Sequence, residues 1–532
     1  MKTLLDLTHD IQAQESEIRQ GGGTAGQERQ RRLGRLTARE RVESLLDPGT
    51  KFYELGVWSA WGMYSQWGSV PAAGVIVGIG IVQSRFVMVV ANDATVKAGA
   101  FFPQTVKKVL RAQRIAFSFR LPLVYLVDSS GVFLPLQDEI FPDEDDFGRI
   151  FRNNAVISAA GIPQYSAVMG NCVAGGAYLP VLSDTLLMTE GSQLYLAGPA
   201  LVKAAIGQTA DPEELGGAKM HAEISGTVDY REPDDPSCIS RLRSLIELLP
   251  SRCPVETPAA AYSAERDQNA VYSIAPGDGR GEFDVRELLK CVVDVGSINE
   301  FRAEYGETIV TVHARIGGLP VGIVANQCQR CRSASGELQI GGVIYADSAE
   351  KAARFVMECN QTGVPIIFFQ NVQGFMVGRQ SEQAGIIRSG AKLVNVVSNT
   401  IVPKLTVIIG GSFGAGNYAL CGKAYDPWLI LAWPGARYAV MGADQAADTL
   451  LSLKVRDAER GGKPITEEER RQLRDDIRQC YAEQMDIRHG AARGWVDAII
   501  APQETRRWLE LALRMIPATV TRAEFRTGMI QM

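Results

Sequence analysis

The chain has 532 residues, of which 46% are hydrophobic and 22% charged, with a formal net charge of −5. This length exceeds what one hydrophobic core usually supports, so we expect two large domains. The charge balance argues against nucleic-acid binding and against a polybasic membrane surface, and the longest apolar run, near residues 71–82, is too short to span a membrane.

The N-terminal segment, residues 1–20, carries acidic side chains and lacks an apolar secretory core, so we expect no signal or transit peptide. Nine cysteines are scattered along the chain, and the one close pair is Cys328 and Cys331. A structural zinc site needs about four ligands, and no second pair lies nearby. We therefore expect reduced thiols in a cytoplasmic protein, with zinc or redox use of this pair as the alternative.

The predicted elements of the first half come in a fixed order along the chain. A strand ends at Asp93, a helix follows over 106–120, and a second strand ends in the turn "DSSG" at 128–131. A third strand then runs into a glycine-rich break, "MGNCVAGGAY", at 169–178. Alternating strands and helices indicate an α/β layered fold with right-handed crossovers.

The second half repeats this order. Its strand ends at Gln327, its helix covers 348–361, its turn is "NVQG" at 371–374, and its glycine-rich break is "IGGSFGAGNY" at 409–418. The two breaks align without a gap at an offset of 240 residues, and the preceding turns at 243. A repeat of this length is too long for a solenoid unit and indicates a duplicated domain.

Two insertions distinguish the halves. The offset grows from 234 at the first matched strand to 243 at the turns, which places extra residues in or near "CQRCRSASGELQIGG" at 328–342. It reaches 268 where "GTVDY" at 226–230 matches "GWVDA" at 494–498. That second surplus falls on the charged segment 454–479, whose spacing predicts an exposed pair of helices.

A glycine-rich junction between a strand and a helix exposes backbone N–H groups at the helix N-terminus, where they have no intrahelical partner. Such groups bind anions or stabilise an oxygen that becomes negative during a reaction. The alternative is that the glycines only permit close packing. Because two copies match in register, we predict two oxyanion holes.

No catalytic base is evident beside these holes. None of the four histidines lies in a glycine turn, and no P-loop lysine follows the glycines. Ser129 and Ser130 are possible nucleophiles, but no His–Asp partner is evident, so a polar turn is the preferred interpretation. A ligand that supplies the base would account for this pattern.

The ordered set of motifs resembles the carboxyltransferase (beta) subunits of the biotin-dependent acyl-CoA carboxylases. It runs from "RLTARERVESLLDPGTKFYELG" at 35–56 through "MGNCVAGGAY" and "QNVQGFMVGR" to "IIGGSFGAGNY" and "WPGARYAVMG". The segments 194–207 and 370–379 are most similar to the 3-methylcrotonyl-CoA and geranyl-CoA branch. The resemblance implies two tandem crotonase-like (ClpP/crotonase) α/β domains from an internal duplication, which we place at 1–285 and 286–532.

The resemblance also implies roles for individual residues. The amides of Gly175 and Gly176 would hold the thioester oxygen of the acyl-CoA enolate, and those of Ala415 and Gly416 the ureido oxygen of biotin. Carboxybiotin would release CO2, the biotin anion would take the acidic proton, and the enolate would attack CO2. The implied substrate-pocket residues are Ser130, Gly131, Val132, Phe133, Gly374 and Phe375. Candidate contacts to CoA phosphates, with a solvated helix face as the alternative, are Lys97, Lys107, Lys108, Arg111, Arg39 and Arg41.

This sequence departs from the family beside the acyl pocket, since "DSSGVF" stands where relatives usually read "DSGGA". Ser130, Val132 and Phe133 are bulkier than the residues of the relatives, which leaves open a substrate other than 3-methylcrotonyl-CoA. The resemblance to the branch named above implies 3-methylcrotonyl-CoA or a related branched or unsaturated acyl-CoA. The alternatives are a propionyl- or acetyl-CoA carboxyltransferase, a biotin-dependent acyl-CoA decarboxylase subunit, and a non-catalytic CoA-binding scaffold.

Partners follow from the same resemblance. The chain shows neither an ATP-binding carboxylase domain nor a biotin attachment module, so the biotin must come from a biotin carboxylase or carrier subunit. We expect a hexamer that is a trimer of dimers, with each site formed between the first half of one subunit and the second half of another. We expect no metal, nucleic acid or membrane partner.

Overall fold

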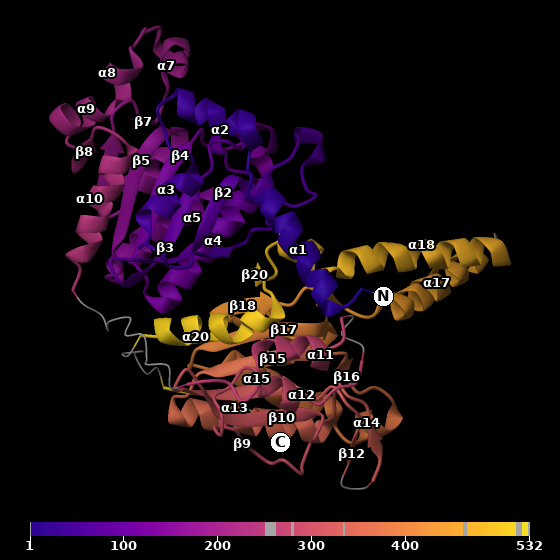
Figure 1. Cartoon of the computed structure of the whole chain (residues 1–532). Helices are drawn as coiled ribbons and strands as arrows, with labels where there is room; N and C mark the ends of the chain where they lie inside the picture. Colours follow the sequence, from indigo (N-terminus) through magenta and orange to yellow (C-terminus); the bar gives the residue numbers. More distant parts are fainter. Residues whose placement is uncertain are drawn as a thin grey trace. The chain divides into compact units, whose positions relative to one another are not determined.

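The computed structural model describes residues 2–250, 262–277, 281–333, 336–460, 465–517 and 524–529. The chain forms two compact units (Figure 1). The N unit comprises residues 13–257 and 492–494, and the C unit comprises residues 1–12, 258–491 and 495–532.

The division falls near residue 257 rather than at the expected position after residue 285. Residues 262–277 belong to the C unit, to which their backbone is hydrogen-bonded. The N–H of Arg266 donates to the carbonyl of Lys290 (3.0 Å), and that of Val295 donates to Ser263 (3.0 Å). The sequence repeat gives no signal for residues 262–285, since its first matched strand in the second half, Leu319–Asn326, lies after them.

The N unit is built on a mixed sheet that is antiparallel at β1–β2–β3 and parallel from β3 onward. Its strand order is β1 (Tyr53–Leu55), β2 (Val75–Val82), β3 (Arg85–Asn92), β4 (Leu123–Ser129), β5 (Gln164–Val173), β6 (Thr185–Thr189) and β8 (Tyr230–Glu232), with β7 (Gln193–Tyr195) paired to the end of β5.

The C unit repeats this arrangement strand for strand. Its order is β9 (Asn299–Glu300), β10 (Ile309–Ile316), β11 (Leu319–Asn326), β15 (Ile366–Val372), β17 (Lys404–Phe413), β18 (Leu429–Ala432) and β20 (Ala498–Ile499), with β19 (Arg437–Ala439) paired to the end of β17. The register bears out the predicted offsets, because Leu187 pairs with Tyr230 in one sheet and Leu431 with Ala498 in the other.

Helices cover these sheets. Those of the N unit are α2 (Gly23–Arg32), α3 (Ala38–Leu45), α4 (Pro103–Phe119), α5 (Phe147–Ala159), α6 (Tyr178–Val181), α7 (Pro199–Ile206), α8 (Pro212–Gly216), α9 (Ala218–Met220) and α10 (Asp235–Glu247). Those of the C unit are α11 (Val271–Ile274), α12 (Val285–Leu289), α13 (Ala346–Thr362), α14 (Arg379–Gln383), α15 (Ile386–Ser398), α16 (Gly414–Ala419), α17 (Ala443–Arg460), α18 (Glu467–Met485) and α20 (Thr505–Met515). The assignment changes from one unit to the other within α1 (Leu4–Ile18) and α19 (Ile487–Ala492).

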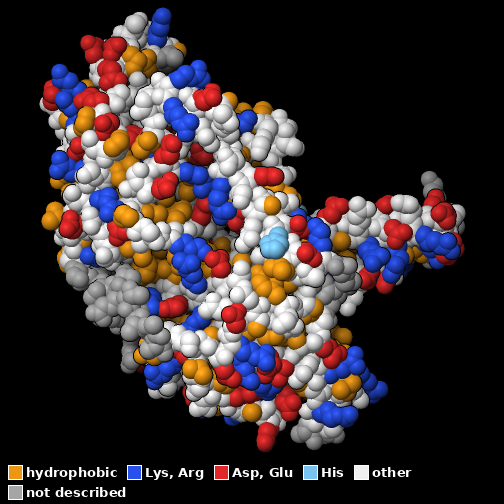
Figure 2. Space-filling model, viewed as in Figure 1, with side chains coloured by type: hydrophobic (Ala, Val, Ile, Leu, Met, Phe, Trp, Pro, Cys, Tyr) orange, Lys and Arg blue, Asp and Glu red, His pale blue; other side chains and the backbone are white. Residues whose placement is uncertain are grey.

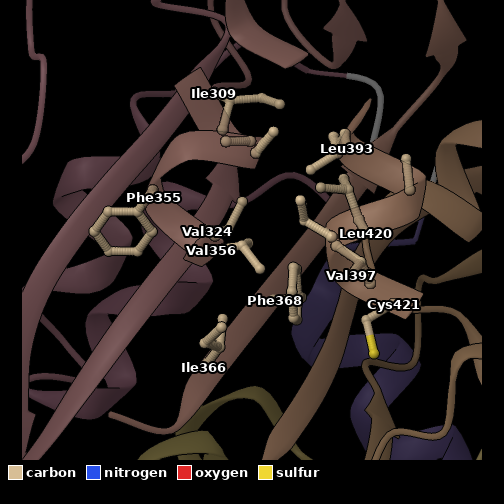
Figure 3. Packing of buried hydrophobic residues seen from close by; sticks show 14 of the residues in the cluster. Ile309, Val324, Phe355, Val356, Ile366, Phe368, Leu393, Val397, Leu420 and Cys421 are labelled. Atoms are coloured by element: carbon tan, nitrogen blue, oxygen red, sulfur yellow. The ribbon is translucent and has the colours of Figure 1, made fainter. Parts of the chain in front are cut away.

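Local sequence explains why α4 and α13 begin at matching places. Thr105 accepts a hydrogen bond from the N–H of Phe102 (3.0 Å) through its hydroxyl, and Ser348 accepts from that of Tyr345 (3.0 Å). Each helix buries an apolar face, and α13 packs with α15 over one face of the C-unit sheet. Phe355 and Val356 of α13, Leu393 of α15 and Phe368 of β15 meet in that core (Figure 3).

The predicted insertions take the form of a short hairpin and a helix pair. The hairpin of β12 (Cys331–Arg332) and β13 (Leu338–Gln339) precedes β14 (Val343–Ile344), which pairs with β16 (Gly374–Phe375). Helices α17 and α18 form the predicted charged pair, on which basic and acidic side chains are interspersed (Figure 2). Among the described residues, no helix combines the length and the apolar composition needed to cross a bilayer.

Candidate active site

Each glycine-rich break places two backbone amides at the start of a helical turn. In the N unit, β5 ends at Val173 and the 3₁₀ turn η5 (Ala174–Ala177) begins. In the C unit, β17 ends at Phe413 and α16 begins. Gly175 and Gly176 occupy the second and third positions of their turn, as Ala415 and Gly416 do of theirs. We call the first pair of amides the first hole and the second pair the second hole.

These amides lack the acceptor that an ordinary helix supplies. A serine, threonine or aspartate at the N-cap normally accepts a hydrogen bond from the second or third N–H. Here the N-cap residues are Val173 and Phe413, whose side chains have no acceptor atom, and neither makes a side-chain cap bond. Gly175 and Ala415 are exposed, whereas Gly176 and Gly416 are buried. Each hole therefore offers N–H donors to a ligand oxygen.

The two glycine turns lie directly against the holes. Gly131 has φ +86° and Gly374 has φ +131°, conformations that side chains rarely adopt. A Cβ placed on Gly176 would lie 3.9 Å from the Cα of Gly131, and one placed on Gly416 would lie 3.4 Å from that of Gly374. The structure thus brings together in each unit the two glycine motifs that the sequence singled out.

Comparisons with known proteins identify the family of the chain. The carboxyl transferase domain family matches residues 29–527. The chain is 44% identical to the biotin-dependent 3-methylcrotonyl-coenzyme A carboxylase beta1 subunit of Mycobacterium tuberculosis, over 93% of this chain and 91% of the relative. It is 41% identical to the mitochondrial methylcrotonoyl-CoA carboxylase beta chain of Dictyostelium discoideum, over 96% and 84% of the two chains.

The chain belongs to the carboxyl transferase family. The crystal structure of the P. aeruginosa geranyl-CoA carboxylase beta subunit superposes with a TM-score of 0.85 at 32% identity, covering 99% of this chain and 96% of that one. The resemblance that the sequence motifs indicated, to carboxyltransferase beta subunits of biotin-dependent acyl-CoA carboxylases, is confirmed.

In this carboxyltransferase the segment that follows the first glycine turn is fixed by a short parallel ladder. The N–H of Ser130 donates to the carbonyl of Ala98 (3.0 Å), that of Phe101 to Gly131 (2.8 Å), and that of Phe133 to Phe101 (2.9 Å). Val132 is half-buried and pairs with Phe101 in an isolated parallel β-bridge. Ser129 Oγ donates to the carbonyl of Gly99 (2.7 Å), as expected of a polar turn.

Aromatic packing holds the Phe133 ring in place. It stacks on Phe102 with 4.3 Å between ring centroids and meets the edge of Trp67 at 5.5 Å. The ring of Phe375 in the C unit packs against α15, since a Cβ on Gly390 would lie 3.0 Å from it. Both side chains are therefore anchored in their own unit beside a glycine turn, and their contact with an acyl group stays a prediction.

Sequence reasoning did not assign a role to Phe147, which lies behind the first hole. A Cβ on Gly175 would meet its ring at 3.5 Å, and one on Gly176 at 4.0 Å. The ring of Phe147 also makes edge contacts with the rings of Phe101 and Phe151, with 4.9 Å between ring centroids in each pair. Its position in the motif "FGRIFRNNAVISAAGI" was the available signal.

The expectation that Arg41 and Lys108 bind CoA is wrong, because both side chains are buried and bonded inside the N unit. Arg41 donates to Asp235 (2.7 Å), Asp128 (3.3 Å) and the carbonyl of Met169 (2.9 Å). Lys108 donates to the carbonyls of Ala72 (3.0 Å) and Val75 (2.7 Å), and burial lowers its pKa to about 7.

The other basic candidates differ in whether their side chains are already paired and in how exposed they are to solvent. Arg39 is engaged through both terminal nitrogens with Glu54 (3.1 and 3.0 Å). Arg111 is half-buried, whereas Lys97 and Lys107 are exposed. Lys97 and Lys107 are consequently the candidates best placed to reach a phosphate group.

The Cys328 and Cys331 pair is buried, and the amide of Asn371 donates to the Cys328 sulfur (3.2 Å). Burial raises the pKa of the Cys328 thiol to about 12, so it stays protonated and unreactive at neutral pH. This favours the reduced-thiol interpretation over redox use.

Proposed function

We propose that this chain transfers a carboxyl group from biotin to an acyl-CoA, with the acyl thioester in the first hole and biotin in the second. The supporting observation is the matched pair of uncapped amides at the ends of β5 and β17, each closed by a glycine turn. The named relatives support 3-methylcrotonyl-CoA or a related branched, unsaturated acyl-CoA as the substrate.

The first hole acts on the thioester. As the acyl-CoA loses its acidic proton, negative charge develops on the thioester oxygen, and the amides of Gly175 and Gly176 stabilise it. One such donor is typically worth about 3–4 kcal/mol in the transition state. Biotin, when bound, supplies both the carboxyl group and the basic nitrogen.

The second hole fits the ureido oxygen of biotin by the same chemistry. Ala415 and Gly416 present two adjacent N–H groups, and Ala415 is exposed. A urea carbonyl accepts two hydrogen bonds, so a pair of backbone donors matches it without any charged side chain. These residues therefore hold and orient the group and stabilise negative charge on its oxygen.

The proposal includes an origin by internal duplication of a crotonase-like domain. The two sheets share one strand order, including the strand that pairs only with the end of β5 or β17. Duplication of one site would give two holes with the same chemistry, each of which binds one carbonyl oxygen.

We propose further that a second copy of the chain covers each hole, as in a trimer of dimers. Exposed apolar side chains occur at matching positions beside both holes: Leu134 and Val377, Tyr178 and Tyr418, Leu196 and Val440. Apolar patches of this kind usually mark protein interfaces. An N unit and a C unit of different copies would then bring acyl-CoA and biotin together.

We assign the biotin to a partner subunit that also performs the ATP-dependent step. We place the chain in a reducing compartment such as the cytoplasm. The Met-flanked lysine of a biotin module has one look-alike, Lys219 in "GGAKMHA", which lacks the preceding methionine. The purified chain should give no streptavidin signal and no ATP-dependent bicarbonate fixation. Biotin found on Lys219 by mass spectrometry, or fixation by this chain alone, would overturn the assignment.

The test of the two holes uses an acyl-CoA panel with free biotin as the second substrate. Gly176→Val and Gly416→Val should each abolish transfer. Gly175→Ala is the matched control, because the second hole carries Ala415 at that position, and it should retain most activity. Near-normal transfer by a folded Gly176→Val or Gly416→Val variant would contradict the two-hole proposal.

A further inference from the structure

A chain of four buried polar side chains supports the second hole from beneath. Ser412 Oγ donates to Gln370 Oε1 (2.6 Å). Asn417 Nδ2 donates to Ser412 Oγ (2.7 Å) and to Tyr438 Oη (2.8 Å). Gln370 Nε2 donates to the carbonyl of Leu420 (2.7 Å) at the end of α16. The four residues come from β15, β17, α16 and β19, so one network ties together four of the elements around the hole.

The equivalent positions beneath the first hole are apolar. Cys172 pairs with Leu194 in the register of β5 and β7, just as Ser412 pairs with Tyr438 in that of β17 and β19. Val127 stands at the position of Gln370, and Ala177 at that of Asn417. All four counterparts are buried, and Cys172 reaches only the carbonyl of Gly176, at 3.5 Å. The two holes therefore have the same backbone but different support.

The network acts on the position of the hole amides. Asn417 directly follows Gly416, and its side chain is bonded to the strand that precedes the hole. Gln370 is bonded to the far end of the same short helix. Since α16 has six residues and cannot hold its own orientation by length, these bonds fix the direction of its first N–H groups.

The network also carries no charge. Burial raises the pKa of the Tyr438 hydroxyl, so it stays protonated, and the N–H of Lys423 donates to it. The remaining members are amides and a serine hydroxyl. Rigid neutral dipoles can orient donors without attracting an ion into the site, which suits a neutral urea carbonyl.

We propose that Gln370, Ser412, Asn417 and Tyr438 are positioning residues for the second hole and thereby for the ureido oxygen of biotin. The inference rests on the proposed assignment of biotin to that hole. Acyl-CoA can be held by its long CoA portion, whereas biotin is small and its ureido oxygen is held by the hole. Orientation of two amides must then be set in advance, because misplacement by about 1 Å can cost on the order of 100-fold in rate.

The test compares Ser412→Cys and Tyr438→Phe with the matched control Cys172→Ser, which changes the equivalent position beneath the first hole. Hydrogen exchange, read by mass spectrometry, should rise at least about tenfold for the amides of residues 414–420 in the first two variants. The value of kcat/KM for free biotin should fall about 10- to 100-fold, while KM for the acyl-CoA stays within about twofold. Cys172→Ser should leave exchange at 414–420 and kcat/KM for biotin unchanged.

Unchanged exchange and unchanged biotin kinetics in both variants would overturn the inference. Equal losses for biotin and acyl-CoA together with a lower Tm would also overturn it, since they indicate a purely structural role. If the wild-type chain does not use free biotin at all, the proposed function fails. The exchange of residues 414–420 still decides whether the network positions α16.

Discussion

At the scale of single residues, Lys108 and Lys351 show how matching positions can be used differently. They lie 243 residues apart on α4 and α13, the offset of the surrounding repeat. Lys108 donates to two carbonyls, one of which belongs to Ala72, a residue in the left-handed region at φ +49°. The Nζ of Lys351 is equally buried, but among the described residues it has no acceptor.

Replacing these lysines by methionine should therefore have unequal effects. Lys108→Met leaves two buried carbonyls without a donor and should lower the free energy of unfolding by about 2–4 kcal/mol. Lys351→Met removes a buried ammonium that has no acceptor in the described structure, and should change stability by less than about 1 kcal/mol or raise it. Urea unfolding of both variants checks this, and similar losses in the two would contradict it.

Lys108 also predicts a dependence of stability on pH. Its pKa is lowered to about 7 in the folded chain by burial, whereas an unfolded chain keeps the proton to about pH 10. Between these values the unfolded state binds more protons, so this group makes stability rise with pH. The stability advantage of the wild type over Lys108→Met should thus grow from pH 7 to pH 10 in urea unfolding. A constant difference would show that Lys108 keeps its charge when folded.

At the scale of elements, much of the architecture was predictable because most elements occur in two matched copies, and each copy supports the assignment of the other. Strand ends, glycine turns and the charged helix pair each follow from local pattern, and two matched copies exclude most alternatives. Burial of Arg41 was not predictable, because its partner Asp235 is 194 residues away. Nor was the polar network beneath the second hole, since Tyr438 joins it only through strand pairing.

The α17–α18 pair should be the element that opens most easily. Met485 is the residue of α18 that is buried, and the bonds of Arg474 to Asp448 (2.8 Å) and Arg478 to Asp444 (2.9 Å) lie at exposed sites. Exposed ion pairs contribute only about 0–1 kcal/mol and are screened by salt.

Hydrogen exchange should accordingly be fast in 467–484 and slow in α13, whose apolar face is buried. Raising the salt concentration to about 1 M should accelerate exchange in the helix pair, with little effect on α13. Equal protection of the two elements would show that other contacts hold the pair in place.

At the scale of the whole molecule, the proposed assembly can be tested at the matched apolar side chains beside the two holes. Leu196→Asp and Val440→Asp place a charge in each patch and should shift the chain towards smaller species, since a buried unpaired charge strongly disfavours association. Light scattering after size-exclusion chromatography measures the mass. The substitution Leu453→Asp, at an exposed position on the α17–α18 pair, is the control. An unchanged mass in both patch variants would contradict the assembly.

The assignment of residues 1–12 to the C unit has a consequence for synthesis on the ribosome. Leu4 lies against Gly277 and reaches towards Gly435, so the last of these packing partners emerges more than 400 residues after it. At about 5–20 residues per second, that delay lasts on the order of 20–90 s. Residues 13–257 of the N unit can fold meanwhile, but the first turns of α1 must wait with Leu4 and Ile11 uncovered. A nascent-chain binding factor, or an N-terminal fusion, would therefore act on the maturation of the distant C unit rather than on the domain made first.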